Sequence, residues 1–259
     1  IAVTDGFGSL ERFPYRIAIP APSLYAQFKK DTSIGLILDA LVNIGFDDVF
    51  EVARAADIVT EATRHLLASG NCKKPLISSA CPAVVRLIRV RFPSLLQHLS
   101  DIDSPMEVAA NIAREEFSKK RGVNKKDVGS VLSPLGRKKS NVDGTISIVD
   151  AFAKLNAEIS KPGIKRHGFE SRSLQAGVGW AAAGGEEHAL SGYSHLSVDG
   201  IHNIIQLLEE VENGRFADLD FIEALSCTGG CLGGPLTFEN AYVAKMRLSK
   251  VIEKMPPVS

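Results

Sequence analysis

The sequence predicts an α/β fold with two lobes, each a mostly parallel twisted sheet flanked by helices, and a site between the lobes. Short apolar segments alternate with longer amphipathic ones along the 259 residues, and such βαβ alternation produces parallel sheets with right-handed crossovers. The alternation restarts after residue 140, so we expect lobes over approximately 16–134 and 140–250 of one domain spanning 16–259. We interpret residues 1–15 as a lead-in from a longer protein.

Apolar runs and capping residues define the elements of the first lobe. Residues 104–107 (SPME) form a capping box with proline at the first helical position, which predicts a helix to about Phe117. The basic run 119–126 is interpreted as a solvated loop. We expect strands over 16–20, 48–51, 75–79 and 129–132, and helices over 34–44, 55–67 and from Pro82 onward.

The second lobe repeats this alternation of strands and helices. Strands are expected over 145–148, 196–198 and 221–225, and helices over 149–159, 201–211 and 241–254. Apolar residues at helical spacing predict one buried face on the second of these helices. That face carries Ile201, Ile204, Ile205, Leu208 and Val211.

Composition narrows the class of protein. Thirty basic and thirty acidic side chains give a formal net charge of zero, so no overall field favours nucleic acid or an anionic membrane. No apolar run approaches the roughly 20 residues that a membrane-spanning helix needs, and the sequence shows no leader of the secretory type. We therefore expect a cytoplasmic protein that binds neither nucleic acid nor membrane.

Three of the four cysteines directly follow predicted strands. Cys81 comes after the strand 75–79, and Cys227 and Cys231 follow the strand 221–225 in a glycine-rich loop. Open α/β sheets bind ligands at the carboxyl ends of their strands, so the three thiolates meet there if the lobes face each other. They suit an iron–sulfur cluster, whose ligands commonly come from distant loops. A zinc site and inert buried thiols are the alternatives.

Five segments in a fixed order carry a more specific signal. They are 21–23 (APS), 45–50 (GFDDVF), 79–82 (SACP), 92–100 (FPSLLQHLS) and 221–234 (FIEALSCTGGCLGG). The third and fourth segments resemble the first signature of the [FeFe]-hydrogenase catalytic domain, and the last segment resembles its third signature. The resemblance extends from about residue 16 to about residue 247, which is nearly the whole chain.

This resemblance implies an H-cluster, a [4Fe–4S] cubane joined through one cysteine to a two-iron unit that carries CO, cyanide and a dithiolate. By position, Cys81 and Cys227 would bind the cubane, and Cys231 would bridge it to the two-iron unit. Seven further residues would lie at the cofactor: Ala21, Pro22, Ser23, Met106, Ser133, Trp180 and Leu225.

The proton path departs from the family pattern. Ala80 stands where the family has its proton-donating cysteine, and a methyl group can neither donate nor accept a proton. Glu61 and Ser100 keep their places along the usual path, whereas the next acid is replaced by Arg64. With Leu225 in place of a methionine, these departures resemble the sensory branch of the family, which turns hydrogen over slowly.

The second signature is incomplete in this chain. After the pair Ser133-Pro134 the family has the fourth cubane cysteine, followed closely by a lysine that binds cyanide, but here Leu135 follows. Either this ligand is lost or residues are missing between Pro134 and Leu135. We favour the second interpretation, because a loop that orders only around a cluster is easily missed without it. Lys138 is a weaker candidate for the cyanide-binding lysine.

The resemblance predicts a hydrogenase-type oxidoreductase of low activity, namely a hydrogen sensor with slow, reversible H₂ oxidation and proton reduction. The implied partners are H₂ and protons, electron-transfer iron–sulfur domains, hydrogenase maturation proteins, and a signalling kinase or phosphatase. Two other functions stay open. One is an iron–sulfur assembly scaffold of the same family without the two-iron unit, and the other is a structural zinc protein.

The remaining polar candidates receive structural interpretations. Glu186 and Glu187 are expected at an exposed helix start. The six histidines show no metal-ligand spacing, which predicts surface or capping roles for each. Cys72 lies in a polar turn and is interpreted as a free surface thiol.

Overall fold

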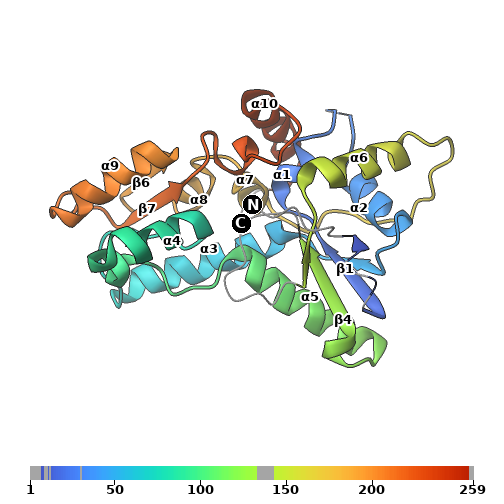
Figure 1. Cartoon of the computed structure of the whole chain (residues 1–259), viewed down its shortest axis with the longest axis horizontal. Helices are drawn as coiled ribbons and strands as arrows, with labels where there is room; N and C mark the ends of the chain where they lie inside the picture. Colours follow the sequence, from blue (N-terminus) through green and yellow to red (C-terminus); the bar gives the residue numbers. More distant parts are fainter. Residues whose placement is uncertain (1–6, 9–10, 12, 30, 133–142, 257–259) are drawn as a thin grey trace.

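The computed structural model describes residues 7–8, 11, 13–29, 31–132 and 143–256, and within them seven strands are flanked by helices (Figure 1). The strands are β1 (Tyr15–Ile19), β2 (Asp48–Val49), β3 (Leu76–Ile77), β4 (Val128–Leu132), β5 (Gly144–Thr145), β6 (His195–Asp199) and β7 (Phe221–Leu225). The α-helices are α1 (Pro22–Tyr25), α2 (Ile34–Asn43), α3 (Val52–Ser69), α4 (Pro82–Arg91), α5 (Pro105–Arg121), α6 (Ile148–Ile159), α7 (Gln175–Gly179), α8 (Gly185–Ala189), α9 (Ile201–Glu212) and α10 (Ala241–Ile252). Short 3₁₀-helices are η2 (Pro93–His98), η3 (Lys125–Asp127) and η4 (Gly230–Gly233).

The strands form two parallel sheets, as the fold class predicts. One sheet has the order β2-β1-β4-β5 and the other the order β3-β7-β6, and the pairings among these described strands are all parallel. The sequence suggested that the two lobes divide near residues 134–140, but the two sheets are not separated at that point of the chain. The strand β3 joins the later strands through the pair Leu76↔Phe221, and β5 joins the earlier ones through Val131↔Gly144. The strands β3 and β5, which join the sheet of the other half of the chain, have only two residues each. Their partners are therefore selected by tertiary packing.

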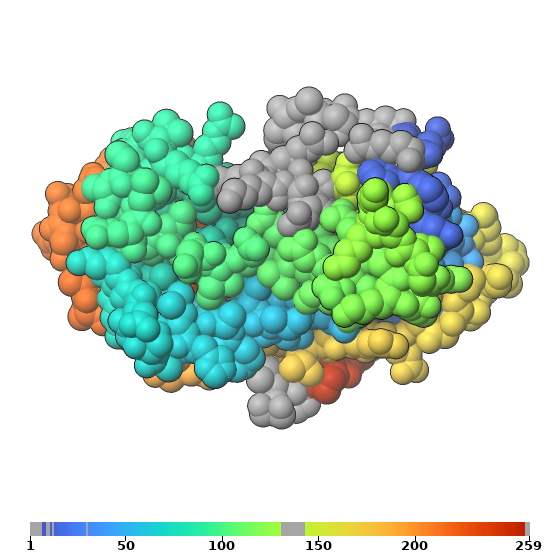
Figure 2. All heavy atoms as spheres, turned by 90° about the horizontal axis from the view of Figure 1, so that it is seen from below, coloured from blue at the N-terminus to red at the C-terminus, as the bar shows by residue number. Residues whose placement is uncertain are grey.

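Each sheet has its own apolar core, and α3 connects the two ends of the molecule. One core packs β1 against α5 through residues such as Ile17 and Phe117, and another packs β7 against α4 and α9 through Ile222, Ile88 and Leu208. The helix α3 contacts both α5 and α7. Figure 2 shows α3 and the chain after it running along one face from one end toward the other. The fold therefore leaves a junction between the two sheet edges.

Most of the predicted helices and strands are present, with three local corrections. The helix α5 continues to Arg121, so the start of the basic run 119–126 is helical and not a loop; Gly122 ends it in the left-handed conformation, and positive charges are favourable in a last helical turn. The Ser104 side chain makes no capping hydrogen bond. On α9, Ile201 is 37% exposed and lies outside the buried face, which carries Ile204, Leu207, Leu208 and Val211. No helix among the described residues is both long and apolar enough to cross a membrane.

Candidate metal centre

Adjacent strands of one sheet bring the cysteine loops together. The strands β3 and β7 are parallel neighbours, so their carboxyl ends reach the same edge. Cys81 follows β3 as the N-cap residue of α4, and Pro82 occupies the first turn of that helix. Cys227 and Cys231 lie in the loop that follows β7. The expected convergence is therefore present, but its cause is strand pairing within one sheet and not two cysteine-bearing lobes facing each other.

A serine hydroxyl links two of these cysteines. The Cys81 thiol donates to Ser226 Oγ over 3.4 Å, and Ser226 Oγ lies 3.8 Å from Cys227 Sγ. Burial, and then the charges of Cys81, Cys227 and Glu223, raise the pKa of the Cys231 thiol to about 12. Part of the Cys231 surface stays accessible because this residue borders a cavity. All three thiols thus lie within electrostatic range of one another.

The glycines of the loop allow it to pack closely against residues 181–183. Gly230 has φ +73°, and a Cβ there would lie 2.6 Å from the Ala183 nitrogen. The Leu232 amide donates to Ala181 O over 3.2 Å, and the Gly229 amide donates to an Asp199 carboxylate oxygen. Only glycine adopts a positive φ at low energetic cost, so the sequence of this loop fixes its approach to the helical segment that carries Trp180.

A cavity of about 100 Å³ adjoins Cys81 and Cys231. Most of the predicted site residues form its wall: Ala21, Pro22, Ser23, Ala80, Met106, Trp180 and Leu225. Residues 21–23 follow β1 and therefore come from the other sheet, so the cavity lies where the carboxyl edges of the two sheets meet. The Trp180 indole N–H donates to Thr60 Oγ1 over 3.1 Å, which holds the ring against α3.

Of the predicted site residues that the structure describes, Cys227, Glu61 and Ser100 are not part of this wall. The Glu61 side chain is 58% exposed and pairs with Arg64, which also donates to the Ala189 carbonyl. Ser100 is buried and accepts a hydrogen bond from the Ile102 amide, but it does not border the cavity. Ser133, with the incomplete second signature and Lys138, lies outside the described residues.

Two acids that the sequence analysis did not select do border the cavity. Glu186 is 4% exposed, which corrects the expected surface position, and Glu223 is 1% exposed within the central strand β7. Ser78 Oγ donates to Glu186 over 2.6 Å and accepts from the Ala80 amide over 3.2 Å. In the sequence, Glu223 is recognisable as the single acidic residue in the otherwise apolar strand 221–225, and this could have indicated a buried carboxyl group.

Burial changes the acidity of this carboxyl pair. Burial, and then the neighbouring Glu223 charge, raise the pKa of Glu186 well above its usual range. Burial also raises the pKa of Glu223 to about 7, although its oxygens accept hydrogen bonds from the Gly184 and Glu187 amides. The raised pKa values therefore favour a shared proton on this pair beside the cavity near neutral pH.

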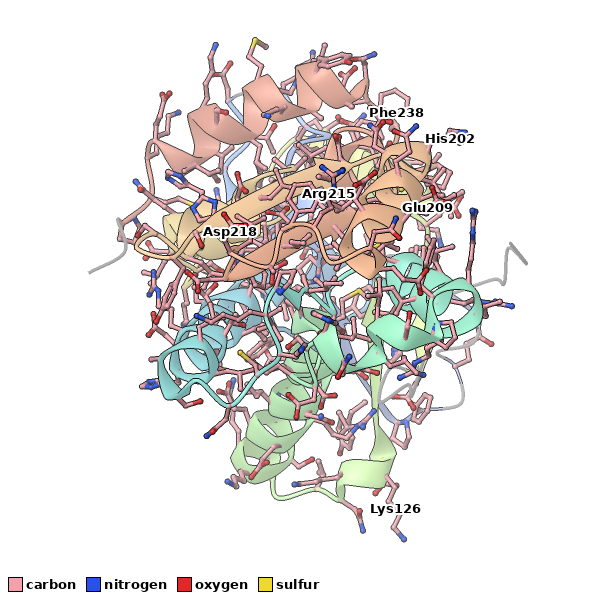
Figure 3. All side chains as sticks on the ribbon, turned by 90° about the vertical axis from the view of Figure 1, so that its left-hand side faces the viewer. Lys126, His202, Glu209, Arg215, Asp218 and Phe238 are labelled. Atoms are coloured by element: carbon pink, nitrogen blue, oxygen red, sulfur yellow. The ribbon has the colours of Figure 1, made fainter. Side chains whose placement is uncertain are left out.

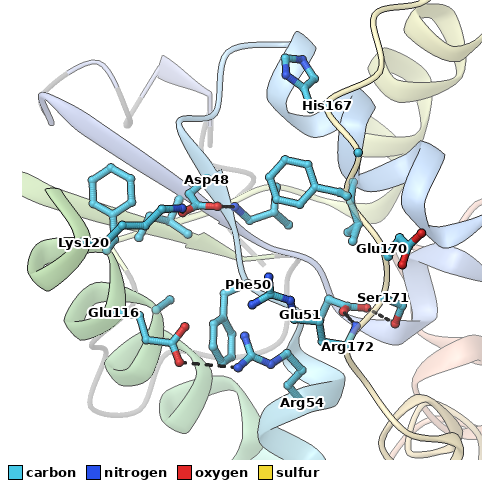
Figure 4. A pocket seen from close by; sticks show the side chains of 17 residues that line it. Asp48, Phe50, Glu51, Arg54, Glu116, Lys120, His167, Glu170, Ser171 and Arg172 are labelled. Atoms are coloured by element: carbon cyan, nitrogen blue, oxygen red, sulfur yellow. Dashed lines mark hydrogen bonds and ion pairs between the residues drawn. The ribbon is translucent and has the colours of Figure 1, made fainter. Parts of the chain in front are cut away.

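A larger cavity of about 570 Å³ lies away from the cysteines (Figure 4). It is bordered by β2, α5 and residues 167–172. Its charges are largely paired: Arg54 lies 3.6 Å from Glu116, and Lys120 lies 3.4 Å from Asp48. Glu51 accepts hydrogen bonds from Tyr25, Ser171 and the Arg172 amide. Cavity size alone therefore does not identify the chemical site of this chain.

Comparison with known proteins identifies the family of this chain. A family model described as "Iron only hydrogenase large subunit, C-terminal domain" matches residues 15–144 and 172–235. The chain belongs to this family. Among curated relatives, iron hydrogenase 1 of Clostridium pasteurianum is 24% identical over 278 residues, covering 83% of this chain and 48% of the relative. The NADP-reducing hydrogenase subunit HndD of Solidesulfovibrio fructosivorans is 29% identical over 136 residues, 46% of this chain and 23% of the relative.

Solved structures of hydrogenases share the fold. A variant of the [FeFe]-hydrogenase HydA1 from Chlamydomonas reinhardtii superposes with a TM-score of 0.72 at 16% identity, covering 95% of this chain and 88% of that chain. The structure of HydA(deltaEFG), whose title describes stepwise assembly of the H-cluster, gives a TM-score of 0.71 at the same identity. The chain spans at most about half the length of the curated relatives that it matches.

The donor set fits an iron–sulfur cluster better than a single ion. Among the described residues, no group of three or more histidine, cysteine, aspartate or glutamate side chains is arranged around one metal ion. Cys81 and Cys231 instead border the cavity, and the Ser226 hydroxyl lies between Cys81 and Cys227, so the three thiols are spread as ligands of a larger group would be. Soft thiolates are the ligands that clusters prefer. The fourth ligand expected after Pro134 falls outside the described residues.

Proposed function

We propose that this chain binds an H-cluster and acts as a hydrogen-sensing hydrogenase domain with slow, reversible H₂ oxidation and proton reduction. The observation that carries the proposal is the cavity of about 100 Å³ beside Cys81 and Cys231. A cubane bound by thiolates needs no such neighbouring space. The cavity offers room for a second group on the far side of Cys231.

The residues of this chain would hold the cofactor as follows. Cys81 and Cys227 would bind the cubane, with Ser226 directing both sulfurs, and Cys231 would join it to the two-iron unit. When bound, the cofactor supplies the iron at which H₂ is split and formed, and the redox capacity for its electrons. Ala21, Met106 and Leu225 exclude water from the space, while the Ser23 hydroxyl and the loop amides are donors available to cyanide ligands.

The proposed slow turnover has its cause in Ala80, which lies beside the cavity. The Ala80 methyl group borders the space and cannot carry a proton between the cofactor and the protein. The Glu61 carboxylate, exposed and paired with Arg64, offers no connection through α3. Long-lived hydrogen-bound states suit a sensor, because a signal must outlast a single turnover.

The assembly scaffold is the second candidate function, and it would use the same three cysteines. A scaffold that carries only the cubane needs no cavity beside Cys231, so the cavity favours the H-cluster. Electron-transfer iron–sulfur domains, maturation proteins and a signalling kinase or phosphatase belong to the proposal as partners.

Anaerobic loading of the protein with the maturation machinery tests the proposal. We expect about four irons from the cubane and two more from the second unit, together with infrared bands of CO and cyanide. Cys231→Ser should abolish the bands, while Cys72→Ser, which changes a cysteine remote from the cavity, should leave them unchanged. Iron without the bands would indicate a scaffold, and bound zinc without iron would indicate a structural zinc protein.

A further inference from the structure

The short helix α7 takes the hydrogen-bond acceptors for its first turn from another helix. Its N-cap residue is Leu174, whose side chain makes no capping hydrogen bond, so the first amides of α7 need other partners. Asp57 of α3 supplies them: Oδ2 accepts the Leu174 amide over 3.0 Å, and Oδ1 accepts the Gly177 amide over 2.8 Å. This carboxylate thus does between two helices what a capping side chain does within one.

Close packing leaves α7 little freedom to move relative to α3. A Cβ at Gly177 would lie 2.1 Å from the Ala53 carbonyl oxygen and 2.7 Å from Asp57 Oδ1, so glycine is needed for this approach of the two helices. Burial raises the pKa of Asp57, while its two amide partners oppose that rise. The carboxylate is therefore partly removed from water, and the amides of α7 satisfy its oxygens there.

The far end of α7 carries the aromatic wall of the cysteine cavity. Trp180 directly follows the helix, is 9% exposed and borders the cavity. Its indole N–H donates to Thr60 Oγ1, which belongs to α3 as Asp57 does. Because helical residues three apart lie on one face, Asp57 and Thr60 hold the two ends of α7 from the same side.

The cysteine loop packs against the residue that follows Trp180. The Ala181 carbonyl accepts the Leu232 amide over 3.2 Å. Leu232 directly follows Cys231, so this bond holds the backbone beside the thiol. A displacement of α7 would therefore reach the loop of Cys231, and the series of contacts that begins at Asp57 ends at a candidate ligand.

We propose that Asp57 is a positioning residue of the cysteine cavity, which it arranges by holding the start of α7. Asp57 does not border the cavity itself and acts through Trp180 and the loop of Cys231. The inference rests on the proposed function for its consequence at the cofactor, whereas the placement of Trp180 is a property of the metal-free chain.

A second buried acid offers a matched control. Asp39 of α2 accepts the His167 amide over 3.0 Å and the Phe169 amide over 3.2 Å. Its side chain, which is 0% exposed, also pairs with Arg166. Asp39 thus holds the same connection between α6 and α7, but at an earlier part of the chain. Loss of this carboxylate should therefore cost stability without moving Trp180.

Fluorescence of the metal-free protein provides the first test, because Trp180 is the single tryptophan of the sequence. In Asp57→Asn an acceptor oxygen becomes an NH₂ group that faces an amide of α7. We therefore expect the emission maximum to shift to longer wavelength and acrylamide quenching to increase. Asp39→Asn should leave both unchanged, as should Asp218→Asn at the surface (Figure 3). Unchanged emission in Asp57→Asn, or an equal shift in Asp39→Asn, would overturn the proposal.

Far-UV circular dichroism during urea unfolding shows whether each variant is folded under the conditions of the fluorescence measurement. If Asp57→Asn is unfolded, Asp57→Ser replaces it and Asp39→Ser becomes its control. Serine keeps an oxygen acceptor and places no NH₂ group against the amides. The same difference in emission between the two positions is expected, and equal emission in the two serine variants would overturn the proposal.

Infrared spectra of the loaded protein separate this proposal from the proposed function. Trp180 borders the space beside Cys231, so we expect the CO and cyanide bands to shift in Asp57→Asn and to keep their positions in Asp39→Asn. Bands at the same positions in both variants would overturn the role of Asp57 at the cofactor. If the unmodified chain shows no bands, the proposed function is wrong, whereas a fluorescence shift confined to Asp57→Asn still supports the placement of Trp180 by Asp57.

Discussion

The cavity beside the cysteines has two chemically different parts of its wall. Ala80 before α4, Met106 in the first turn of α5 and Trp180 at the end of α7 provide apolar atoms. Glu186 and Glu223 provide buried carboxyl groups from α8 and β7. Ser78 connects them, because it accepts from the Ala80 amide and donates to Glu186. Ala80, which the resemblance places where the family has its proton-donating cysteine, is therefore two hydrogen bonds from a carboxyl group whose pKa is raised well above its usual range.

The comparison shows that losing one proton donor does not make a site aprotic. A methyl group at Ala80 adds no charge to the wall of the cavity. The acids remain because backbone amides and Ser78 satisfy their oxygens, which is the condition for burying a polar group. We expect changes on the acidic part of the wall to have larger effects than changes on the apolar part.

The largest effect is expected from Glu186→Gln. Glutamine keeps the shape and the hydrogen bond from Ser78 but cannot release a proton, so H₂ turnover should fall about 10²- to 10⁴-fold. The infrared bands of the loaded protein should be retained, which separates lost proton transfer from lost cofactor. Glu253→Gln on exposed surface is the control. If Glu186→Gln and Glu253→Gln turn H₂ over at the same rate, the acidic part of the wall has no greater effect on turnover than exposed surface, and the expected difference between the two parts is wrong.

The second effect concerns folding and not turnover. The folded state raises the pKa of Glu223 from 4.5 to about 7, so the folded chain binds more protons than the unfolded chain in that range. Stability therefore falls as pH rises between these values, by about 3 kcal/mol, since one pKa unit is about 1.4 kcal/mol. Glu223→Gln should remove most of this fall. Denaturant unfolding of the metal-free protein at about pH 5 and about pH 8 measures it, and an unchanged fall contradicts the assignment.

A third prediction concerns the loop that carries Cys231. Gly230→Ala places a Cβ 2.6 Å from the Ala183 nitrogen at a positive φ, so it should destabilise the protein by about 1–3 kcal/mol and reduce iron loading. Gly163 also has a positive φ, of +70°, but nothing within 4 Å of its Cβ. The loss of stability in Gly163→Ala thus reports only the strain of a positive φ, without the close contact that Gly230→Ala adds. Similar melting temperatures for the two variants would show that close packing against Ala183 is unimportant.

The smallest effect is expected from Ala80→Cys on the apolar part of the wall. A thiol there restores a proton-transfer group at the cavity, so turnover should rise, but by less than about 10²-fold because Arg64 still interrupts the α3 route. H₂ oxidation by fully loaded protein measures the gain. Combining Ala80→Cys with Glu186→Gln sharpens the test, since the gain should shrink if the thiol depends on the carboxyl pair. An unchanged rate with Ala80→Cys in fully loaded protein means that another step limits turnover.

The sequence by itself determined the local chemistry of this protein. Apolar runs predicted most strands, including Phe221–Leu225 at its observed bounds. The order of the cysteine, glycine and proline segments indicated the hydrogenase family, which the family model supports independently. The position of Ala80 beside Cys81 follows from covalent connectivity, and no packing can change it.

Only the tertiary structure decided which distant residues share the cavity. Strand periodicity specifies which face a residue occupies but not which strand becomes its neighbour, so the pairing of β3 with β7 was not predictable from the sequence. The same limit explains Glu186, which was predicted on the surface but is 4% exposed. Whether a carboxyl group keeps its charge depends on the desolvation and hydrogen bonds that segments far along the chain supply.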